Sequence, residues 1–338
     1  MRGTILYGSK DIRFEDVPEP KIEKPTDAII RLAVTCVCGS DLWSYRGIQS
    51  VTEPTPMGHE YCGYVEEVGT AVTSVKLGQF VVGSFAMSDN TCPHCRFGYQ
   101  SSCQQREWVT RAQAPYMRVA LADGTLVPTS GLPSDGLLPS LLAASDVLGT
   151  GWFAADAANV KKGSTVVVVG DGAVGLLGVL SAKQMGAERI IAMSRHETRQ
   201  KLAREFGATD IVTERGGEGI ARIKELTQGI GADSALECVG TQEAMEQAIQ
   251  STRPGGFVSY VGVPHGVQLH AQPLFFSHVH LHGGPAPVRR YLPKLMDLIL
   301  NGTIQPGKVF DFELPLEKVA DGYAAMDERR AIKTLLRP

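Results

Sequence analysis

The chain has 338 residues, of which 43% are hydrophobic and 20% charged, and its formal net charge at pH 7 is −3. At roughly 150 residues per domain, this length predicts about two domains, and the slightly acidic balance argues against a surface for nucleic acid or anionic membranes. No apolar run approaches the roughly 20 residues that a membrane span needs.

The start of the chain and its cysteines indicate the cellular compartment. The first residues, MRGTILYGSKDIRF, lack the apolar core of a signal peptide. The seven cysteines are odd in number, and several lie close together. Without an export signal, this pattern favours metal ligands or free thiols over a disulfide framework. We therefore expect a cytoplasmic protein that has neither nucleic acid nor a membrane as partner.

The chain up to Thr150 is rich in Val, Gly and Pro, and it contains short alternating runs such as 28–34 and 61–69. Such runs predict β-strands separated by turns. Three fragments in this part, 36–41 (CVCGSD), 58–60 (GHE) and 146–150 (DVLGT), contain residue types that bind metals. Cysteine, histidine and carboxylate together suit a zinc site with one open position. Taken singly, the fragments have ordinary explanations: a buried cysteine, a structural histidine and a helix-capping aspartate.

A second group of cysteines lies in the stretch SDNTCPHCRFGYQSSC, residues 88–103. Its three thiols belong to Cys92, Cys95 and Cys103, whereas structural zinc usually has four ligands. Either the fourth ligand is missing, or the carboxylate of Asp89 takes its place.

The chain changes character after Thr150 and alternates between two kinds of element. Strands are predicted at 164–170, 189–193, 210–212, 234–239 and 257–261, and helices at 173–187, 197–206, 218–227 and 242–251. This alternation predicts an α/β unit with a parallel, doubly wound sheet. Further helices are predicted at 291–300 and 316–326.

A glycine-rich loop connects the first predicted strand of this unit to its first helix. The sequence Gly170-Asp171-Gly172-Ala173-Val174-Gly175 matches GxGxxG. In this position the glycines allow a tight turn and a close approach to a pyrophosphate, which the helix N-terminus attracts. An ordinary glycine-rich turn is the alternative, but the strand–loop–helix context favours dinucleotide binding.

The end of the second predicted strand suggests which dinucleotide is bound. An enzyme that uses NAD usually has Asp or Glu there, which accepts hydrogen bonds from the ribose 2′-hydroxyl and repels a 2′-phosphate. Here Ser194 follows the strand, and Arg195 and Arg199 lie close behind. Guanidinium groups suit a phosphate, so the sequence predicts a preference for NADP. Alternatively, both arginines are solvated charges at the start of a helix.

Seven motifs occur in the order typical of zinc-dependent medium-chain alcohol dehydrogenases, and the chain resembles this family over almost its whole length. They are CGSD (38–41), GHE (58–60), CPHC-x7-C (92–103), GDGAVG (170–175), ECVG (237–240), RPGG (253–256) and VGVPH (261–265). The resemblance implies a β-rich, GroES-like catalytic domain, 1–147 and 287–338, with a Rossmann domain, 148–286, inserted in it. It also implies a homodimer or homotetramer.

The resemblance implies that Cys38, His59 and Asp146 are the ligands of a catalytic zinc, and that Glu60 is a nearby carboxylate able to ligate transiently. Cys36 is a geometric competitor of Cys38, because side chains two residues apart on a strand share a face. Cys38 is preferred, since GSD follows it as in the family.

Further roles follow from the same resemblance. Ser40 would accept the proton of the substrate hydroxyl, and Asp41 would orient His59 as a zinc ligand. Contacts with the cofactor are implied for Thr150, Val261, Val263 and Lys333, the last facing the pyrophosphate, and Phe85 would line the substrate pocket. In the cysteine loop the family pattern is C-x2-C-x2-C-x7-C. Here Asp89 stands first, which predicts a structural zinc held by Asp89, Cys92, Cys95 and Cys103.

Two departures from the family pattern stand out. Trp43 occupies the position at which many relatives have a histidine that relays the proton, and the segment 111–116 (RAQAPY) lacks the usual pair of glycines. The first departure requires another route for the proton, through ribose hydroxyls and water.

The predicted activity is the reversible transfer of hydride between an alcohol and NADP, assisted by zinc. A polyol dehydrogenase is the nearest alternative, although such enzymes more often have Glu as the third zinc ligand. A quinone or enoyl reductase of the same fold would lack Cys38, His59 and the cysteine loop. A nucleic-acid-binding zinc ribbon is opposed by the acidic charge balance.

Overall fold

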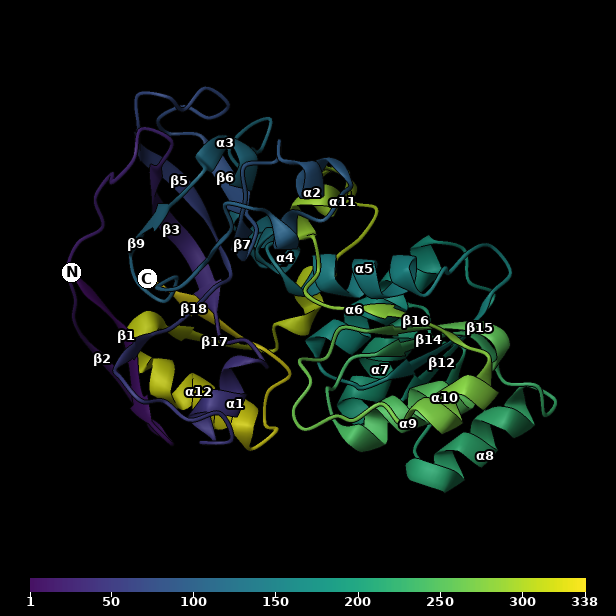
Figure 1. Ribbon diagram of the computed structural model, residues 1–338. Helices are drawn as coiled ribbons and strands as arrows, with labels where there is room; N and C mark the ends of the chain where they lie inside the picture. The colour runs from purple at the N-terminus through teal and green to yellow at the C-terminus, as the bar shows by residue number, and fades with distance from the viewer. The chain divides into compact units, whose positions relative to one another are not determined.

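A computed structural model describes all 338 residues, and in it the chain forms two compact units. Unit 1 consists of Met1–Gly149 and Pro287–Pro338, and unit 2 is Thr150–Ala286. The sequence predicted the boundaries after residues 147 and 286. Both ends of the chain therefore contribute to unit 1, and a single continuous segment forms unit 2 (Figure 1).

Unit 1 is built mainly from antiparallel strands. Its largest sheet has seven strands, in the order β10-β6-β5-β3-β18-β17, with β9 also paired to β3. The sheet β2-β1-β4 and the pair β7-β8 are smaller. The strands are β1 (Arg2–Gly8), β2 (Asp11–Asp16), β3 (Ala28–Cys36), β4 (Thr55–Pro56), β5 (Tyr61–Val68), β6 (Phe80–Gly83), β7 (Ala86–Met87), β8 (Glu107–Trp108), β9 (Tyr116–Val119), β10 (Leu126–Pro128), β17 (Phe312–Pro315) and β18 (Thr334–Arg337).

The helices of unit 1 are short, apart from α11. They are α1 (Asp41–Tyr45), α2 (Pro93–Arg96), α3 (Ala122–Thr125), α4 (Leu138–Ala144), α11 (Val288–Leu300) and α12 (Val319–Asp327), with 3-10 turns η1 (Gln100–Ser102), η2 (Asp135–Leu137), η3 (Pro306–Val309) and η4 (Leu316–Lys318). Helix α5 (Val147–Ala157) begins in unit 1 and continues into unit 2.

The C-terminal segment completes the central sheet of unit 1. Strand β18 pairs antiparallel with β3, and Leu335 faces Cys36. Figure 1 shows the yellow β18 beside the purple β3, although the two are far apart in the sequence. The pairing brings Lys333, which precedes β18, close to the segment that follows β3. One core of the unit includes Val37, Leu42 and Tyr323, so apolar side chains anchor the chain on both sides of Cys38.

Unit 2 is a parallel sheet with helices between its strands. The strand order is β13-β12-β11-β14-β15-β16, and every neighbouring pair is parallel. The strands are β11 (Thr165–Val169), β12 (Arg189–Met193), β13 (Asp210–Val212), β14 (Ala232–Glu237), β15 (Thr252–Tyr260) and β16 (His280–Gly283), and the helices are α6 (Ala173–Gln184), α7 (Glu197–Phe206), α8 (Gly216–Leu226), α9 (Gln242–Ser251) and α10 (Ala271–Ser277).

The order of these strands predicts where a ligand would bind. Counted from β11, the order is 3-2-1-4-5-6, which is that of the Rossmann fold. The chain reverses its direction across the sheet between β11 and β14, so the carboxyl ends of these strands border the crevice in which such folds bind ligands. Strand β11 reads TVVVV and has four buried valines, as a strand covered on both faces requires.

The predicted fold class is confirmed, and most predicted elements lie within a few residues of the observed ones. Helices 197–206 and 242–251 and strand 210–212 have the predicted bounds. Strand β15 begins at Thr252, before the predicted 257, because Thr252 already pairs with Ala232 of β14. The register then shifts across the Pro-Gly-Gly sequence that indicated a turn, and regular pairing resumes at Phe257. Strand β16 and helices α4, α5 and α10 were not predicted.

No single helix is both long enough and apolar enough to cross a membrane. Only the bent pair Asp135–Ala144 and Val147–Ala157, taken together, reaches that length and composition.

Candidate active site

Two groups of metal-binding side chains form in unit 1. In the first, the ligand atoms of Cys38, His59, Glu60 and Asp146 all lie within 4.8 Å of one another. In the second, the same holds for Asp89, Cys92, Cys95 and Cys103. We call the first group the catalytic cluster and the second the cysteine loop. Both combinations are those that the sequence predicted, and Cys36 belongs to neither.

Three separate segments bring the catalytic cluster together. Cys38 follows β3, His59 and Glu60 precede β5, and Asp146 lies between α4 and α5. The hydroxyl of the buried Ser145 accepts a hydrogen bond from Tyr61 N (3.0 Å) and donates one to the carbonyl of Gly83 (2.7 Å). Ser145 therefore fastens the residue before Asp146 to the strand that follows Glu60.

Gly58 sets the approach to His59. Its φ is +93°, a conformation that favours glycine. A Cβ atom at this position would lie 2.5 Å from Gln113 N, so any larger residue would push the two segments apart. Steric crowding and the positive φ therefore explain why the first residue of the GHE motif is glycine.

The two ring nitrogens of His59 have different neighbours. Nε2 lies 3.3 Å from Oδ2 of Asp146, and Nδ1 lies 3.4 Å from Oδ1 of Asp41. The sulfur of Cys38 lies 3.8 Å from the same Asp146 oxygen. An Nδ1–H donated to Asp41 leaves the lone pair of Nε2 directed at the cluster, which is the arrangement that a metal-binding histidine needs.

Asp41 is itself held by groups on other segments. Its Oδ2 accepts from Cys38 N (3.0 Å) and from the hydroxyl of Tyr323 (3.4 Å). Gln113, which is fully buried, donates from Nε2 to Cys36 O (3.0 Å) and lies 3.2 Å from the Tyr323 hydroxyl. Gln113 and Tyr323 were not predicted. The only signal for Gln113 was that segment 111–116 departs from the family pattern.

Lys333 lies beside Glu60 and has no exposed surface. Its Nζ donates to Oε1 of Glu60 (2.7 Å) and to the carbonyl of Val37 (3.1 Å), and both side chains are at most 1% exposed. The second oxygen of Glu60, Oε2, is buried without a hydrogen-bond partner. The structure therefore gives Lys333 a neighbour that the sequence did not predict, and its contact with a cofactor pyrophosphate stays a prediction.

The electrostatics of the catalytic cluster favour a cation. Burial raises the pKa of Cys38 and of Glu60, against the influence of Lys333. Burial alone would lower the pKa of His59, but Cys38, Asp41 and Asp146 raise it well above its usual value. Without a metal the thiol of Cys38 is therefore harder to ionise and the ring of His59 binds a proton more readily, and a divalent cation would compete with these protons.

The donor set and its spacing fit zinc. Cysteine, histidine and carboxylate are zinc ligands, and three protein ligands leave one position for substrate. The separations of 3.3 Å and 3.8 Å within the cluster are close to the roughly 3.3–3.8 Å that bonds of about 2.0–2.3 Å impose on a tetrahedron. Glu60 Oε2, with no partner, is a further oxygen within reach.

Aromatic side chains extend from His59 towards solvent. The Phe85 ring packs edge-on against His59, with centroids 6.4 Å apart, and stacks on Trp108 at 5.8 Å. The guanidinium of Arg106 covers the Trp108 ring at 4.4 Å, and Trp108 is 44% exposed. Phe85, predicted to line the substrate pocket, thus belongs to an aromatic wall of Phe85 and Trp108 beside the cluster.

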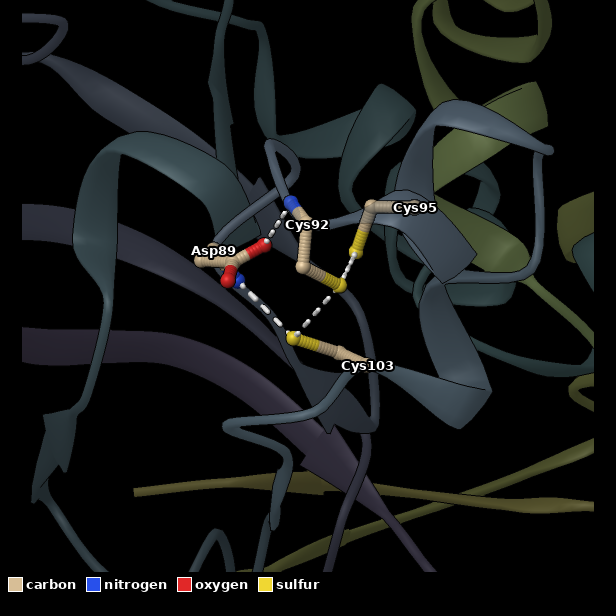
Figure 2. A group of neighbouring side chains, drawn as sticks. All are labelled: Asp89, Cys92, Cys95 and Cys103. Atoms are coloured by element: carbon tan, nitrogen blue, oxygen red, sulfur yellow. Dashed lines mark hydrogen bonds between the residues drawn. The ribbon is translucent and has the colours of Figure 1, made fainter.

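The cysteine loop forms a second pocket of ligand atoms, which Figure 2 shows. The sulfur of Cys92 lies 3.5 Å from that of Cys95 and 3.9 Å from that of Cys103. These distances exceed a disulfide bond of about 2.05 Å. They bracket the roughly 3.8 Å expected between two thiolates on one tetrahedral zinc.

Asp89 completes the loop from the side opposite Cys95. Its Oδ1 accepts from the backbone N–H of Thr91 (2.8 Å). Figure 2 shows that Oδ1 also accepts from the backbone N–H of Cys92 (2.9 Å), and that the backbone N–H of Asp89 donates to the Cys103 sulfur (3.4 Å). Despite partial burial, these hydrogen bonds lower the pKa of Asp89. An ionised carboxylate beside three sulfurs is a donor set that zinc accepts.

In unit 2 the glycine loop fits a dinucleotide. Gly170 has φ +119°, and a Cβ on Gly175 would lie 2.0 Å from the carbonyl oxygen of Gly170. A Cβ on Gly172 would meet nothing within 4 Å, so there is open space in front of the loop. Gly172 is the N-cap of α6 and has no side chain to occupy the first N–H groups, which remain available to a phosphate.

Most of the predicted cofactor residues of unit 2 lie at the carboxyl ends of its strands. Gly170 follows β11, Ser194 follows β12 and Val261 follows β15. A Cβ on Gly240, after β14, would lie 2.1 Å from the carbonyl oxygen of Val263, so the turns after β14 and β15 touch. Ala173 and Val174 open α6, whereas Thr150 is a buried residue of α5.

The residues predicted to recognise a 2′-phosphate have protein partners. The hydroxyl of Ser194 donates to Oδ2 of Asp171 (2.7 Å), and the guanidinium of Arg199 lies 3.2 Å from Oδ1 of the same carboxylate. Arg195 is directed elsewhere, and its Nε donates to Thr213 O (3.1 Å). Asp171 thus brings a carboxylate to the end of β12, where the sequence indicated that there was none.

Comparisons with known proteins agree with this geometry. Residues 24–135 match the family described as alcohol dehydrogenase GroES-like domain, and residues 173–301 match the one described as zinc-binding dehydrogenase. The chain is 31% identical to zinc-type alcohol dehydrogenase B of Aspergillus flavus, over 100% of this chain and 81% of the relative. It is 36% identical to a probable D-xylulose reductase A of Emericella nidulans, over 75% of this chain and 72% of the relative.

Among solved structures, an alcohol dehydrogenase from Thermus sp. ATN1 is similar, with a TM-score of 0.90 and 30% identity. The match covers 100% of this chain and 99% of that one. The GroES-like and Rossmann domains predicted from the sequence are therefore confirmed.

Replacing Lys333 with Met is predicted to lower the free energy of unfolding by about 3–5 kcal/mol, because it leaves the buried carboxylate of Glu60 without its counterion. Chemical denaturation of the metal-free protein measures this. The double variant Lys333→Met, Glu60→Gln removes both charges and should recover most of the loss. A single variant as stable as the parent would contradict the ion pair.

The cysteine loop is predicted to hold a second zinc ion, so that the purified protein contains two per chain. Asp89→Asn keeps an acceptor for the N–H groups of Thr91 and Cys92 but is a poor zinc ligand, and it should lose the loop zinc to a chelator sooner than the parent. Asp89→Cys should retain the zinc longer. Metal analysis during chelator treatment measures both, with the exposed Glu53→Gln as control. Equal release from the parent and Asp89→Asn would exclude Asp89 as a ligand.

Proposed function

Because the chain belongs to the zinc-dependent medium-chain alcohol dehydrogenase family, we propose that it oxidises an alcohol by hydride transfer to NADP and catalyses the reverse reduction of the ketone or aldehyde. One observation carries this proposal: Cys38, His59 and Asp146, from three distant segments, present their ligand atoms within 4.8 Å of one another. A carbonyl reductase that uses no metal has no need of such a buried cluster.

The residues of unit 1 divide the work at the alcohol. When bound, zinc would act as a Lewis acid that lowers the pKa of the alcohol. Cys38, His59 and Asp146 would hold the ion, and Asp41 keeps the His59 ring in the orientation that ligation requires. Glu60 would be an additional ligand that binds the zinc transiently. Its Oε1 pairs with Lys333, and its Oε2 makes no hydrogen bond.

Ser40 supports the proposed proton transfer. It is the N-cap residue of α1, yet its side chain makes no capping hydrogen bond, so its hydroxyl is not occupied by the helix end. It lies two residues after Cys38 and can receive the proton that leaves the substrate hydroxyl. Since the indole of Trp43 is a donor only and cannot accept a proton, the proton would continue through ribose hydroxyls and water.

The aromatic wall favours alcohols with an apolar substituent. Phe85 and Trp108 offer flat apolar faces next to His59, whereas a polyol needs hydrogen-bonding groups along its length. We therefore propose a simple or secondary alcohol as substrate. The similarity to a probable D-xylulose reductase supports polyol oxidation as the second candidate. Assaying alcohols, polyols, aldehydes and ketones side by side discriminates between the two.

The preference for NADP is supported by the residue after β12. Ser194 has no charge to repel a 2′-phosphate, and the guanidinium groups of Arg195 and Arg199 belong to the same short segment. Charge-assisted hydrogen bonds from arginine are well suited to phosphate. Of the two, Arg199 is the stronger candidate, because it lies beside the glycine loop through Asp171.

Self-association is proposed from the exposed edge of unit 2. Strand β16 pairs with β15 on one side only, and Phe275 and Phe276 of α10 are 73% and 69% exposed. An open strand edge near exposed aromatic rings is a typical site of association. A homodimer or homotetramer would cover it.

The proposal predicts that Cys38→Ala and His59→Ala lose the catalytic zinc and all measurable alcohol oxidation, while binding of NADPH remains. Cys36→Ala is the matched control, since Cys36 is also buried but lies outside the cluster. Zinc content, alcohol oxidation and nucleotide binding are measured on each variant. Full activity of a rigorously zinc-free preparation, or of Cys38→Ala, would refute the assigned ligands.

For the cofactor, kcat/KM is predicted to be about 10 to 100 times higher with NADP than with NAD, given roughly 1.5–3 kcal/mol for a charge-assisted contact. Arg199→Met should reduce this ratio at least several-fold. Arg204→Met, an exposed arginine on the same helix, should not. A parent enzyme that prefers NAD would show that the proposed cofactor is wrong.

A further inference from the structure

Asp171 stands in the glycine loop, yet its side chain reaches Ser194 at the end of β12. In Rossmann folds that end of the second strand meets the 2′-position of the ribose. Ser194 occupies the position here and is fully buried, and its hydroxyl reaches Asp171 Oδ2 at 2.7 Å. The carboxylate of Asp171 therefore lies within one hydrogen bond of the place where an NAD enzyme has its acidic residue.

The same carboxylate pairs with the arginine that a 2′-phosphate needs. Arg199 NH1 lies 3.2 Å from Asp171 Oδ1 and 3.3 Å from the Asp171 carbonyl oxygen. The side chains of Arg199 and Asp171 are only 12% and 16% exposed, so water screens this ion pair less than one on the surface. Asp171 thus uses one oxygen for Ser194 and the other for Arg199.

We infer that Asp171 sets how strongly the protein discriminates between NADP and NAD, an inference that rests on the proposed use of a nicotinamide dinucleotide. With NAD, the carboxylate accepts a hydrogen bond from the ribose 2′-hydroxyl while Arg199 stays paired. With NADP, the 2′-phosphate must draw Arg199 away from Asp171 and tolerate a negative charge close by. Asp171 therefore favours binding of NAD and Arg199 favours binding of NADP, and these two residues form an ion pair with each other.

This arrangement differs from the usual one in where the carboxylate originates. An acidic residue at the end of β12 would have been visible from the sequence, whereas Asp171 arrives from the turn after the neighbouring strand, β11. It also changes how the cofactor preference can be engineered. Replacing Ser194 with Asp would place a second carboxylate against Asp171, and two such groups in contact cannot both ionise readily. Asp171 itself is the position to vary.

Binding of NADPH and NADH to the full chain tests the inference without any catalytic step. The measured quantity is the ratio of the two dissociation constants, Kd for NADH over Kd for NADPH. Asp171→Asn keeps the size of the side chain and removes its charge. It should raise the ratio roughly tenfold, through tighter NADPH binding and weaker NADH binding, as expected for one charge-assisted contact. Asp171→Ser, a smaller neutral side chain, should shift the ratio in the same direction if Asn disturbs the loop.

Two controls separate this effect from a general loss of charge. Asp210→Asn breaks another ion pair of unit 2, that of Asp210 with Arg189 at 2.9 Å. This pair lies at the opposite ends of the strands in the same sheet, so its loss should leave the ratio within about twofold. Arg199→Gln added to Asp171→Asn should cancel the gain for NADPH. If neither neutral variant raises the ratio, or if Asp210→Asn raises it equally, the inference is overturned.

The experiment also distinguishes failure of the inference from failure of the proposed function. A parent protein that binds NADH more tightly contradicts the proposed preference for NADP, while a raised ratio in Asp171→Asn still supports the role of Asp171. A parent protein that binds neither nucleotide overturns both. If the parent protein oxidises no alcohol but Asp171→Asn still raises the ratio of the dissociation constants, only the proposed zinc chemistry is contradicted.

Discussion

Crowded, buried ligand groups are the constraint on which unit 1 depends. A thiol, an imidazole and two carboxylates converge within 4.8 Å, and Cys38, Glu60 and Asp146 are each at most 8% exposed. Burying this much potential negative charge is costly unless cations compensate it. Lys333 compensates the charge of Glu60, while Asp41 holds the ring of His59. The charges of Cys38 and Asp146 would be compensated by a divalent ion. The antiparallel pairing of β18 with β3 places Lys333, which precedes β18 near the C-terminus, beside the buried Glu60.

The nucleotide half depends on a different constraint, the register of parallel strands. Because β11, β12, β14 and β15 run in one direction, the turns at their carboxyl ends meet along one edge of the sheet. The glycine loop, Ser194 and Val261 gather there although they are far apart in the sequence. Asp171 and Arg199, separated by 28 residues, form an ion pair for the same reason. Charge in this unit is balanced locally, between a loop and the helix after the next strand.

Much of this organisation was predictable from the sequence, and the reason differs between features. The alternation of apolar strands and amphipathic helices predicted the parallel sheet, since periodicity is a local property. Motifs of metal-binding residue types predicted that two groups would form, one with Cys38, His59 and Asp146 and the other in the cysteine loop. Partners that meet only through tertiary structure were not predicted: Lys333 with Glu60, Gln113 with Tyr323 and Asp171 with Arg199. In each pair the two residues have unremarkable surroundings in the sequence, and only the fold brings them together. Strand β16 and helix α10 were also missed, because their polar or exposed residues give no clear periodic signal.

A crystal structure of the zinc-loaded protein, with anomalous scattering recorded at the zinc absorption edge, is the most direct measurement of the central claim. We expect one anomalous peak within about 2.0–2.3 Å of Cys38 Sγ, His59 Nε2 and an Asp146 oxygen, with Lys333 still paired to Glu60. A fully zinc-loaded protein with no peak among these three atoms, or with Cys36 in place of Cys38, would contradict it.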